Sequence, residues 1–261
     1  MCGIVGYIGS NPALDFLIDG LKKLEYRGYD SSGIVVFKEK PYLKKCQGKI
    51  LKLEKTLREK ELKLAQVGLG HTRWATHGVP STVNSHPHVS NSGELYIVHN
   101  GIIENYESIK SVLIKKGYHF KSETDTEVLV NLIEEVKKTE NVKLGKAVQI
   151  ALNQVIGAFA VCLLDKNNPN EIVVAKLGSP LVIGIENNNF YIGSDPSPFI
   201  KYTNRCLYLG DNEMAILNNK NGLTLRSLQT DNILKPKLEN LKLELEQVEK
   251  GGFKHFMLKE I

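Results

Sequence analysis

The sequence predicts an α+β domain of packed layers with mainly antiparallel sheets. Strand patterns occupy both ends of the chain, and helical patterns are grouped between residues 104 and 155. From residue 157 onward, short apolar segments alternate with turns, which is typical of antiparallel strands. With 261 residues, the chain is long enough to bury a sizeable hydrophobic core.

The first elements follow from the apolar pattern near the N-terminus. Residues 3–8 are apolar, lie between glycines, and predict a buried strand. Residues 13–26 repeat leucine and isoleucine at helical spacing, and Arg27-Gly28 supplies the stop. The pattern then predicts strands at 33–37 and 42–46, a lysine- and leucine-rich helix at 50–63, and a strand at 65–72.

The middle of the chain begins with a loop and continues with three helices. Residues 71–92 are rich in His, Pro, Ser, Thr and Asn and show no periodicity, so they predict a loop. A strand at 94–99 ends at Asn100-Gly101. Helices are expected at 104–116, at 125–138 behind a capping box of Thr124 and Glu127, and at 143–155.

The last third predicts strands and then a change of composition. The expected strands are 157–164, 171–176, 181–185, 190–194, 206–209, 213–217 and 223–227. We therefore place one domain at residues 2–230. Residues 231–261 predict a charged linker with a short exposed helix around 238–248, and the apolar residues 255–258 suggest that more chain follows.

Composition narrows the function classes. The net charge is +5, but the lysines are scattered among acidic residues, which argues against a nucleic-acid surface. No apolar run approaches the ~20 residues of a membrane span, and no secretory signal is present. The four cysteines lack Cys-x-x-Cys spacing and are too few for a disulfide framework. We therefore expect a cytoplasmic protein that binds neither nucleic acid nor membrane.

Of the four cysteines, Cys2 is the one whose position in the chain suggests a chemical role. If the initiator methionine is removed, which the small side chain of Cys2 permits, one residue carries a thiol and a free α-amine. The amine titrates at roughly 7.7–8.0 and a thiol at about 8.5, so near neutral pH the amine can accept the thiol proton. Cys2 is therefore a candidate nucleophile with its own base.

Two charged residues could recognise an amino acid beside this thiol. Arg73 ends a strand and opens a loop of hydroxyls and a tryptophan, so its guanidinium is suited to a carboxylate; the alternative is a surface ion pair. Asp125 could hold an ammonium group, although the helix start at 122–127 also explains an acid there.

Asn100-Gly101 allows two interpretations. The pair is a strong hairpin-turn signal, yet a helix rather than a returning strand is expected after it. An asparagine amide and a glycine N–H at a strand end could instead form an oxyanion hole, worth roughly 3–4 kcal/mol per donor.

Neither a metal nor a cofactor is expected. The five histidines between residues 71 and 99 lack the spacing of a zinc site, so hydrogen bonds that order the loop explain them better. Gly3, Gly6 and Gly9 also lack the spacing of a dinucleotide-binding loop.

Five segments together identify a family resemblance. They are Cys2-Gly3-Ile4-Val5-Gly6, Leu24-Glu25-Tyr26-Arg27-Gly28-Tyr29-Asp30-Ser31-Ser32-Gly33, residues 71–78, His99-Asn100-Gly101 and residues 122–127. The chain resembles the glutaminase domain of the glutamine–fructose-6-phosphate aminotransferase (isomerizing) family, also called glucosamine-6-phosphate synthases, which are class II amidotransferases. The resemblance implies a four-layer αββα sandwich of the N-terminal-nucleophile hydrolase type.

The resemblance also implies roles for individual residues. Cys2 would be the nucleophile, with Asn100 and Gly101 as its oxyanion hole. Trp74 would lie on a loop that closes over L-glutamine. The resemblance assigns glutamine binding to Arg73, Thr76, His77 and Asp125, and positioning of the cysteine to Arg27 and Gly28.

The implied reaction is hydrolysis of L-glutamine to glutamate and ammonia through a γ-glutamyl thioester. A sugar-isomerase half, absent here, would use the ammonia to convert fructose 6-phosphate to glucosamine 6-phosphate, in a full enzyme expected to be a homodimer. Two alternatives stay open: the glutaminase half of another class II amidotransferase, or a catalytically silent glutamine-binding module.

Overall fold

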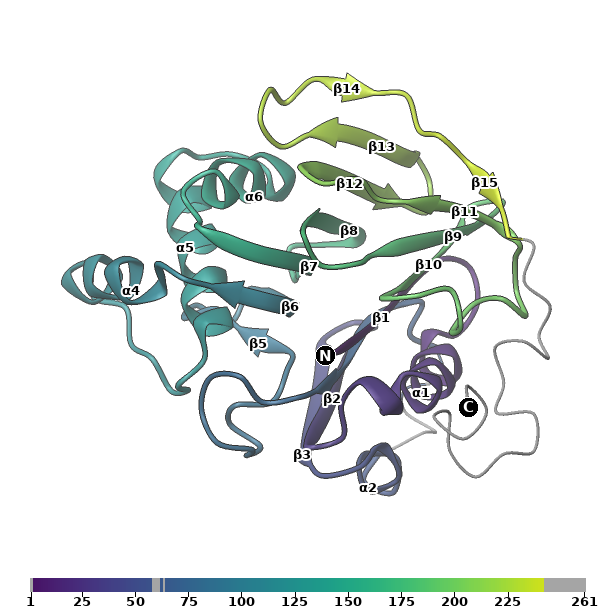
Figure 1. Ribbon diagram of the computed structural model, residues 1–261, viewed down its shortest axis with the longest axis horizontal. Coiled ribbons are helices and arrows are strands. Elements are labelled where there is room, and N and C mark those ends of the chain that lie inside the picture. The colour runs from purple at the N-terminus through teal and green to yellow at the C-terminus, as the bar shows by residue number, and fades with distance from the viewer. Residues whose placement is uncertain (1, 58–61, 63, 242–261) are drawn as a thin grey trace.

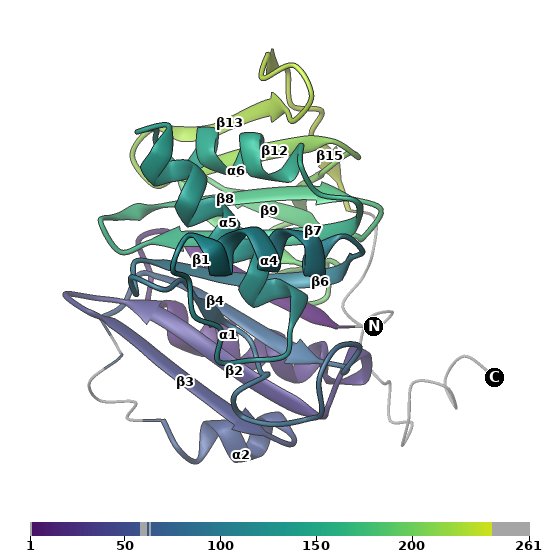
Figure 2. The same ribbon diagram turned by 90° about the vertical axis from the view of Figure 1, so that its left-hand side faces the viewer.

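The computed structural model describes residues 2–57, 62 and 64–241, which form four stacked layers (Figure 1). Two β-sheets face each other in the middle, and helices cover the outer face of each sheet (Figure 2). The predicted α+β class and the αββα layering are both confirmed. None of the described helices is long and apolar enough to cross a membrane.

The eight-stranded sheet is built around the first strand of the chain. Strand β1 (Gly3–Ile8) lies between β4 and β10 and is antiparallel to both. The other strands are β2 (Ser31–Phe37), β3 (Pro41–Gln47), β4 (Val67–Arg73), β9 (Val182–Glu186), β10 (Asn189–Gly193), β11 (Arg205–Tyr208) and β15 (Glu239–Asn240). Cys2 therefore lies at the start of a strand that is paired on both sides within the sheet.

The seven-stranded sheet carries the second half of the chain. Its strands are β5 (His88–Val89), β6 (Leu95–Ile103), β7 (Gly157–Asp165), β8 (Asn168–Leu177), β12 (Glu213–Asn218), β13 (Gly222–Ser227) and β14 (Ile233–Leu234). Every pair of named strands in both sheets is antiparallel, and one isolated parallel bridge joins Phe159 to Gly178. The expectation of mainly antiparallel sheets is confirmed.

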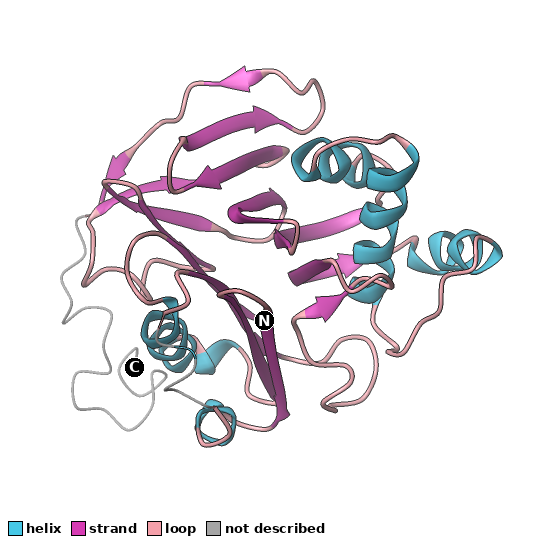
Figure 3. Ribbon diagram, turned by 180° about the vertical axis from the view of Figure 1, so that it is seen from behind, coloured by secondary structure: helices cyan, strands magenta, loops and turns pink. Residues whose placement is uncertain are grey.

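The helices divide between the two outer faces, as the view from behind also shows (Figure 3). The eight-stranded sheet is covered by α1 (Ala13–Lys23) and α2 (Ile50–Glu54), and a short 3-10 turn (Glu25–Arg27) follows α1. The seven-stranded sheet is covered by α4 (Tyr106–Lys115), α5 (Asp125–Thr139) and α6 (Leu144–Leu152).

The four layers pack together through three apolar interfaces. Side chains that alternate between the two faces of a strand contribute to the interfaces on both sides of its sheet. Along β1, Ile4 and Ile8 pack between the sheets, whereas Val5 and Tyr7 pack against α1. Because successive side chains of a strand point to opposite faces, a strand buried on both faces has an uninterrupted apolar sequence. This explains why residues 3–8 contain no charged side chain and why their one side-chain polar group, the Tyr7 hydroxyl, is hydrogen-bonded to Asn189.

Three predicted elements differ from the structure. Strand β6 does not end at Asn100-Gly101 but continues to Ile103, paired throughout with β7, so the hairpin interpretation is wrong. The helix expected at 50–63 is interrupted: α2 covers Ile50–Glu54, residues 55–57 are not helical, and Leu62 is helical again, whereas residues 58–61 and 63 lie outside the described residues.

The third difference concerns the helix expected around 238–248. Glu239–Asn240 instead forms strand β15, which pairs with β11, and residues 242–261 lie outside the described residues. Strand β14 also joins the seven-stranded sheet, so the two sheets include chain beyond residue 230. Two-residue strands without a repeating pattern give no sequence signal of their own.

The start of α5 is capped differently from the capping box predicted. The Thr124 hydroxyl accepts from the Glu127 N–H at 3.3 Å, as expected. The Glu127 carboxylate, however, accepts from the N–H groups of Lys121 and Ser122 rather than from that of Thr124. The acid therefore orders the segment before the helix, next to Asp125.

Candidate active site

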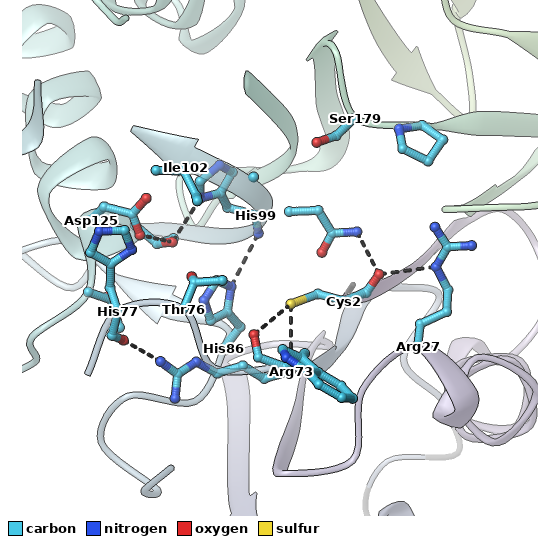
Figure 4. Close-up of a pocket in the computed structure, with 16 residues that line it drawn as sticks. Cys2, Arg27, Arg73, Thr76, His77, His86, His99, Ile102, Asp125 and Ser179 are labelled. Atoms are coloured by element: carbon cyan, nitrogen blue, oxygen red, sulfur yellow. Dashed lines mark hydrogen bonds between the residues drawn. The ribbon is translucent and has the colours of Figure 1, made fainter. Parts of the chain in front are cut away.

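One cavity of about 380 Å³ contains nine of the ten predicted site residues (Figure 4). Cys2 precedes β1, Arg73 ends β4, Asn100 and Gly101 lie in β6, and Asp125 begins α5. The two sheets and the helical layer of the seven-stranded sheet therefore all contribute. The lining residues are Cys2, Arg27, Arg73, Trp74, Thr76, His77, His86, His99, Asn100, Gly101, Ile102, Thr124, Asp125, Thr126, Ser179 and Pro180.

The Cys2 thiol is held by the main chain of Trp74. The Trp74 N–H donates to Sγ at 3.2 Å, and the thiol donates to the Trp74 carbonyl at 3.4 Å. Burial raises the pKa of the Cys2 thiol, and the hydrogen bond with Trp74 only partly opposes that rise. Within the described part of the chain, no side-chain base is hydrogen-bonded to Sγ. A thiol in this environment stays protonated near neutral pH, so it needs a base to become a nucleophile.

Arg27 and Gly28 both act on the position of Cys2. The Arg27 Nε donates to the Cys2 carbonyl at 3.2 Å, while its Nη1 forms an ion pair with Asp195 at 3.1 Å. Gly28 lies against the peptide that joins Arg73 to Trp74, since a Cβ at residue 28 would stand 2.9 Å from the Trp74 nitrogen. A larger residue at position 28 would displace the N–H group that binds Sγ.

Arg73 is buried, which excludes the surface ion pair considered above. Its guanidinium donates to the carbonyl groups of His77, Gly78 (3.1 Å) and Val79 (3.4 Å). These bonds fold residues 74–79 into a loop at the wall of the cavity. Arg73 thus shapes the loop that carries the other predicted binding residues, and it also lines the cavity.

The loop after Arg73 presents three predicted residues to the cavity. Trp74 is 48% exposed, and its ring packs edge to face on Tyr29 at 5.6 Å. Thr76 is exposed, whereas the His77 ring packs against Tyr106 at 5.2 Å. The Ala75 N–H donates to the Asp30 carboxylate, which fastens the loop to the chain before β2.

Asn100 faces the nucleophile from the opposite sheet. Its Nδ2 donates to the Cys2 carbonyl at 3.0 Å and to the Ser194 hydroxyl at 3.0 Å. Gly101 has a φ of +132°, and a Cβ there would lie 2.0 Å from the Ala158 carbonyl oxygen. Glycine is therefore required where β6 passes the cavity. Asn100 thus contacts Cys2, and Gly101 lines the same cavity.

Asp125 is a buried carboxylate at the first residue of α5. Its Oδ2 accepts from the Ile103 N–H at 2.8 Å. The carboxylate therefore lies at the positive end of the helix dipole. The cavity therefore contains an acid at one wall and the guanidinium groups of Arg27 and Arg73 at others.

Three histidines near the site, His71, His86 and His88, are buried, and burial keeps them neutral. Burial lowers the pKa of His71 to about 3, and it lowers the pKa values of His86 and His88 well below the usual value. His86 Nδ1 accepts a hydrogen bond from the His99 N–H at 3.2 Å, and His88 Nε2 is hydrogen-bonded to the Thr124 hydroxyl at 3.1 Å. The described residues include no group of three or more His, Cys, Asp or Glu side chains placed to hold a metal ion.

These histidines make the free energy of unfolding depend on pH. An unfolded histidine takes up a proton near pH 6.5, whereas the buried ones stay neutral, so the unfolded state binds more protons between pH 7 and 5. We therefore expect the free energy of unfolding to decrease as the pH is lowered, by about 2 kcal/mol per buried histidine between pH 7.5 and pH 5. Urea unfolding at several pH values measures this slope.

Two variants control the measurement. His88→Gln should reduce the slope by about one proton, and His119→Gln, at an exposed position, should leave it unchanged. A slope that does not respond to His88→Gln would mean that His88 is already protonated in the folded chain.

Several residues at the site were not anticipated from the sequence. Ser179 and Pro180 line the cavity from the turn between β8 and β9, and Ser194 and Asp195 hold Asn100 and Arg27. All four lie more than 75 residues from the Arg73 loop in the chain. The one local sequence feature near any of these residues is Gly-Ser-Pro at 178–180, which predicts an ordinary turn and does not indicate a site.

Comparison with known proteins gives consistent results. Residues 58–224 match the glutamine amidotransferase domain family. Over its full length, the chain is 51% identical to a glutamine–fructose-6-phosphate aminotransferase (isomerizing) of Bacteroides thetaiotaomicron and 46% identical to one of Chlorobaculum tepidum. It covers 42% and 43% of those two proteins, so it spans less than half of their length.

A solved structure shows the same fold. The glutamine phosphoribosylpyrophosphate amidotransferase from B. subtilis, complexed with ADP and GMP, has a TM-score of 0.74 to this chain and is 26% identical. The match covers 89% of this chain and 50% of that one. The fold is that of the class II, N-terminal-nucleophile amidotransferases, and with more than half of its length matched, the chain belongs to the glutamine amidotransferase domain family.

Proposed function

We propose that this chain hydrolyses L-glutamine to glutamate and ammonia through a γ-glutamyl thioester on Cys2. The observation that carries the proposal is that one cavity unites the Cys2 thiol, the Asn100 amide, the Asp125 carboxylate and the Arg73 guanidinium. A carboxylate and a guanidinium beside a thiol match the α-ammonium and the α-carboxylate of an amino acid. The side chain of glutamine would then present its carboxamide to Sγ.

The first half-reaction would form the thioester. After removal of Met1, the α-amine of Cys2 takes the thiol proton, and Sγ attacks the carboxamide carbon. The oxyanion would accept from the Gly101 N–H and from Asn100 Nδ2, replacing the Cys2 carbonyl that Nδ2 now contacts. The protonated amine then gives its proton to the leaving nitrogen, and ammonia departs.

The second half-reaction would release glutamate. The same α-amine, neutral again, takes a proton from a water molecule, whose oxygen attacks the thioester carbon. The carbon–sulfur bond breaks, the thiol regains its proton, and glutamate leaves. Trp74 and Thr76, on the exposed loop after Arg73, would close over the substrate during both steps.

The ammonia would be used by a second half of a longer enzyme. We propose that in a full-length, homodimeric cytoplasmic enzyme a sugar-isomerase half passes this ammonia to fructose 6-phosphate, giving glucosamine 6-phosphate in amino-sugar biosynthesis. Residues 242–261 would lead into that half. The 51% identity to an aminotransferase of this name, against 26% to the phosphoribosylpyrophosphate enzyme, favours this acceptor.

Incubation of the purified chain with L-glutamine tests the proposal. Glutamate and ammonia should appear in equal amounts, and mass spectrometry after an acid quench should find a γ-glutamyl adduct on the Cys2 peptide. Binding of glutamine without either product would favour the catalytically silent module instead.

Asp125→Asn should raise the KM for glutamine about 10- to 100-fold with a smaller effect on kcat, because a charge-assisted hydrogen bond to the α-ammonium is lost. Asparagine keeps an oxygen for the Ile103 N–H. The measurement compares glutamine with 5-amino-5-oxopentanoate, which lacks the α-ammonium. The wild-type chain should prefer glutamine strongly, and the variant should lose most of that preference. An unchanged preference would place the ammonium elsewhere.

A further inference from the structure

His71 contacts the oxyanion-hole amide but does not line the cavity. It lies in β4, is fully buried, and places its Nε2 at 2.9 Å from Asn100 Oδ1 and 3.1 Å from the His99 carbonyl oxygen. Its ring is stacked on the His86 ring with centroids 4.1 Å apart, which holds it in plane. The mechanism above assigns no task to this residue.

The neighbours of Nε2 determine which ring nitrogen carries the proton. A main-chain carbonyl can only accept a hydrogen bond, so Nε2 must be the protonated nitrogen in order to bond the His99 carbonyl. Burial lowers the pKa of His71 to about 3, so the ring is neutral and Nδ1 carries no proton. Nδ1 indeed has no hydrogen-bond partner in the described structure.

The tautomer in turn determines the orientation of the Asn100 amide. Because Nε2–H is a donor, the Asn100 atom that faces it must be the oxygen. The nitrogen then points the other way, toward the Cys2 carbonyl and the Ser194 hydroxyl, at 3.0 Å from each. An amide turned by 180° would place two donors against each other at His71 and two acceptors against each other at Cys2.

We propose that His71 is a positioning residue of the oxyanion hole: its Nε2–H fixes the Asn100 amide so that Nδ2 faces the reacting carbon. Ser194 assists from the other side, since its hydroxyl also accepts from the Ile4 N–H at 2.8 Å and so ties Asn100 to β1. The inference rests on the proposed glutaminase reaction for its catalytic consequence, but the tautomer and the amide orientation do not.

A matched pair of variants separates the donor from the shape of the ring. Glutamine places its side-chain nitrogen near the position of Nε2 and can donate to Asn100, whereas methionine has similar length and no donor. We expect His71→Gln to keep kcat within about 3-fold and His71→Met to lower it about 10- to 100-fold, less than complete loss of an oxyanion donor. The KM should change little, because Asn100 acts on the transition state.

Two further readouts distinguish positioning from general damage. The aldehyde analogue of glutamine forms a hemithioacetal with Cys2 whose oxygen occupies the oxyanion hole, so its affinity should fall in parallel with kcat in His71→Met. Alkylation of Cys2 by iodoacetamide needs no oxyanion hole and should keep its rate. Equal loss in the Gln and Met variants, or slower alkylation in step with kcat, would overturn the proposal.

The wild-type chain provides a test that needs neither a variant nor turnover. Nitrogen-15 NMR of the histidine side chains should show His71 as the neutral Nε2–H tautomer from pH 5 to 8. An Nδ1–H tautomer or a protonated ring would overturn the proposal even if His71→Met fails to fold. Absence of glutamate release with the expected tautomer would instead refute the proposed function, so the two failures are distinguishable.

Discussion

Cys2→Ala is expected to reduce glutamate release by about 10⁴-fold or more, because the variant cannot form the thioester of the proposed reaction. The structure leaves no second thiol to replace it among the described residues. Cys46, Cys162 and Cys206 are all buried, and none of them lines the cavity. The measurement is the initial rate of glutamate formation at saturating glutamine.

Cys46→Ala is the matched control for this variant. It removes a thiol of the same chain that lies outside the cavity, so it should keep the wild-type rate. The Cys2→Ala chain should still bind glutamine, since Arg73 and Asp125 are intact, and calorimetry can check this. Substantial turnover by Cys2→Ala would place the nucleophile on another residue.

A chain that keeps its N-terminal methionine is expected to lose at least about 100-fold in kcat, because the nitrogen of Cys2 is then part of an amide and cannot act as a base. Burial raises the pKa of the Cys2 thiol, and the described hydrogen bonds of Sγ both involve the Trp74 main chain. In the proposed mechanism the α-amine of Cys2 is the base, and no side-chain base among these hydrogen bonds could replace it.

One preparation can supply both states of the N-terminus. An extension ending in a protease site directly before Cys2 keeps the nitrogen in an amide, and cleavage releases the free amine on the same molecules. Activity should appear in proportion to cleavage as followed by mass spectrometry. Full activity before cleavage would show that the α-amine is not the base.

The candidate nucleophile and the motifs that line the cavity could be recognised in the sequence because they are local. Cys2 is followed by an uninterrupted apolar strand, and the strand that ends at Arg73 leads into a loop with no periodicity. Nearest-neighbour patterns of this kind report directly on strands, helices and loops. The family resemblance added the αββα layering, because composition and periodicity do not determine how two sheets stack.

The extent of β6 and the presence of β15 were not predictable. Asn100-Gly101 has the local chemistry of a turn, but nine residues of β7 pair with β6 on both sides of it and keep the strand extended. Residues 239–240 have a helical, charged sequence context, yet they pair with β11. In both places hydrogen bonds to a distant strand outweigh the local preference.

The sequence by itself determined the residue types of the site: a thiol at the second position, an arginine, an acid, and an asparagine followed by glycine. Only the tertiary structure decided how they are used. It turned the Arg73 guanidinium onto the carbonyl groups of its own loop, and it placed His71 and Ser194 on opposite sides of the Asn100 amide. The physical reason is that hydrogen-bond direction depends on which partners surround a buried group, and here those partners come from residues up to 98 positions apart in the chain.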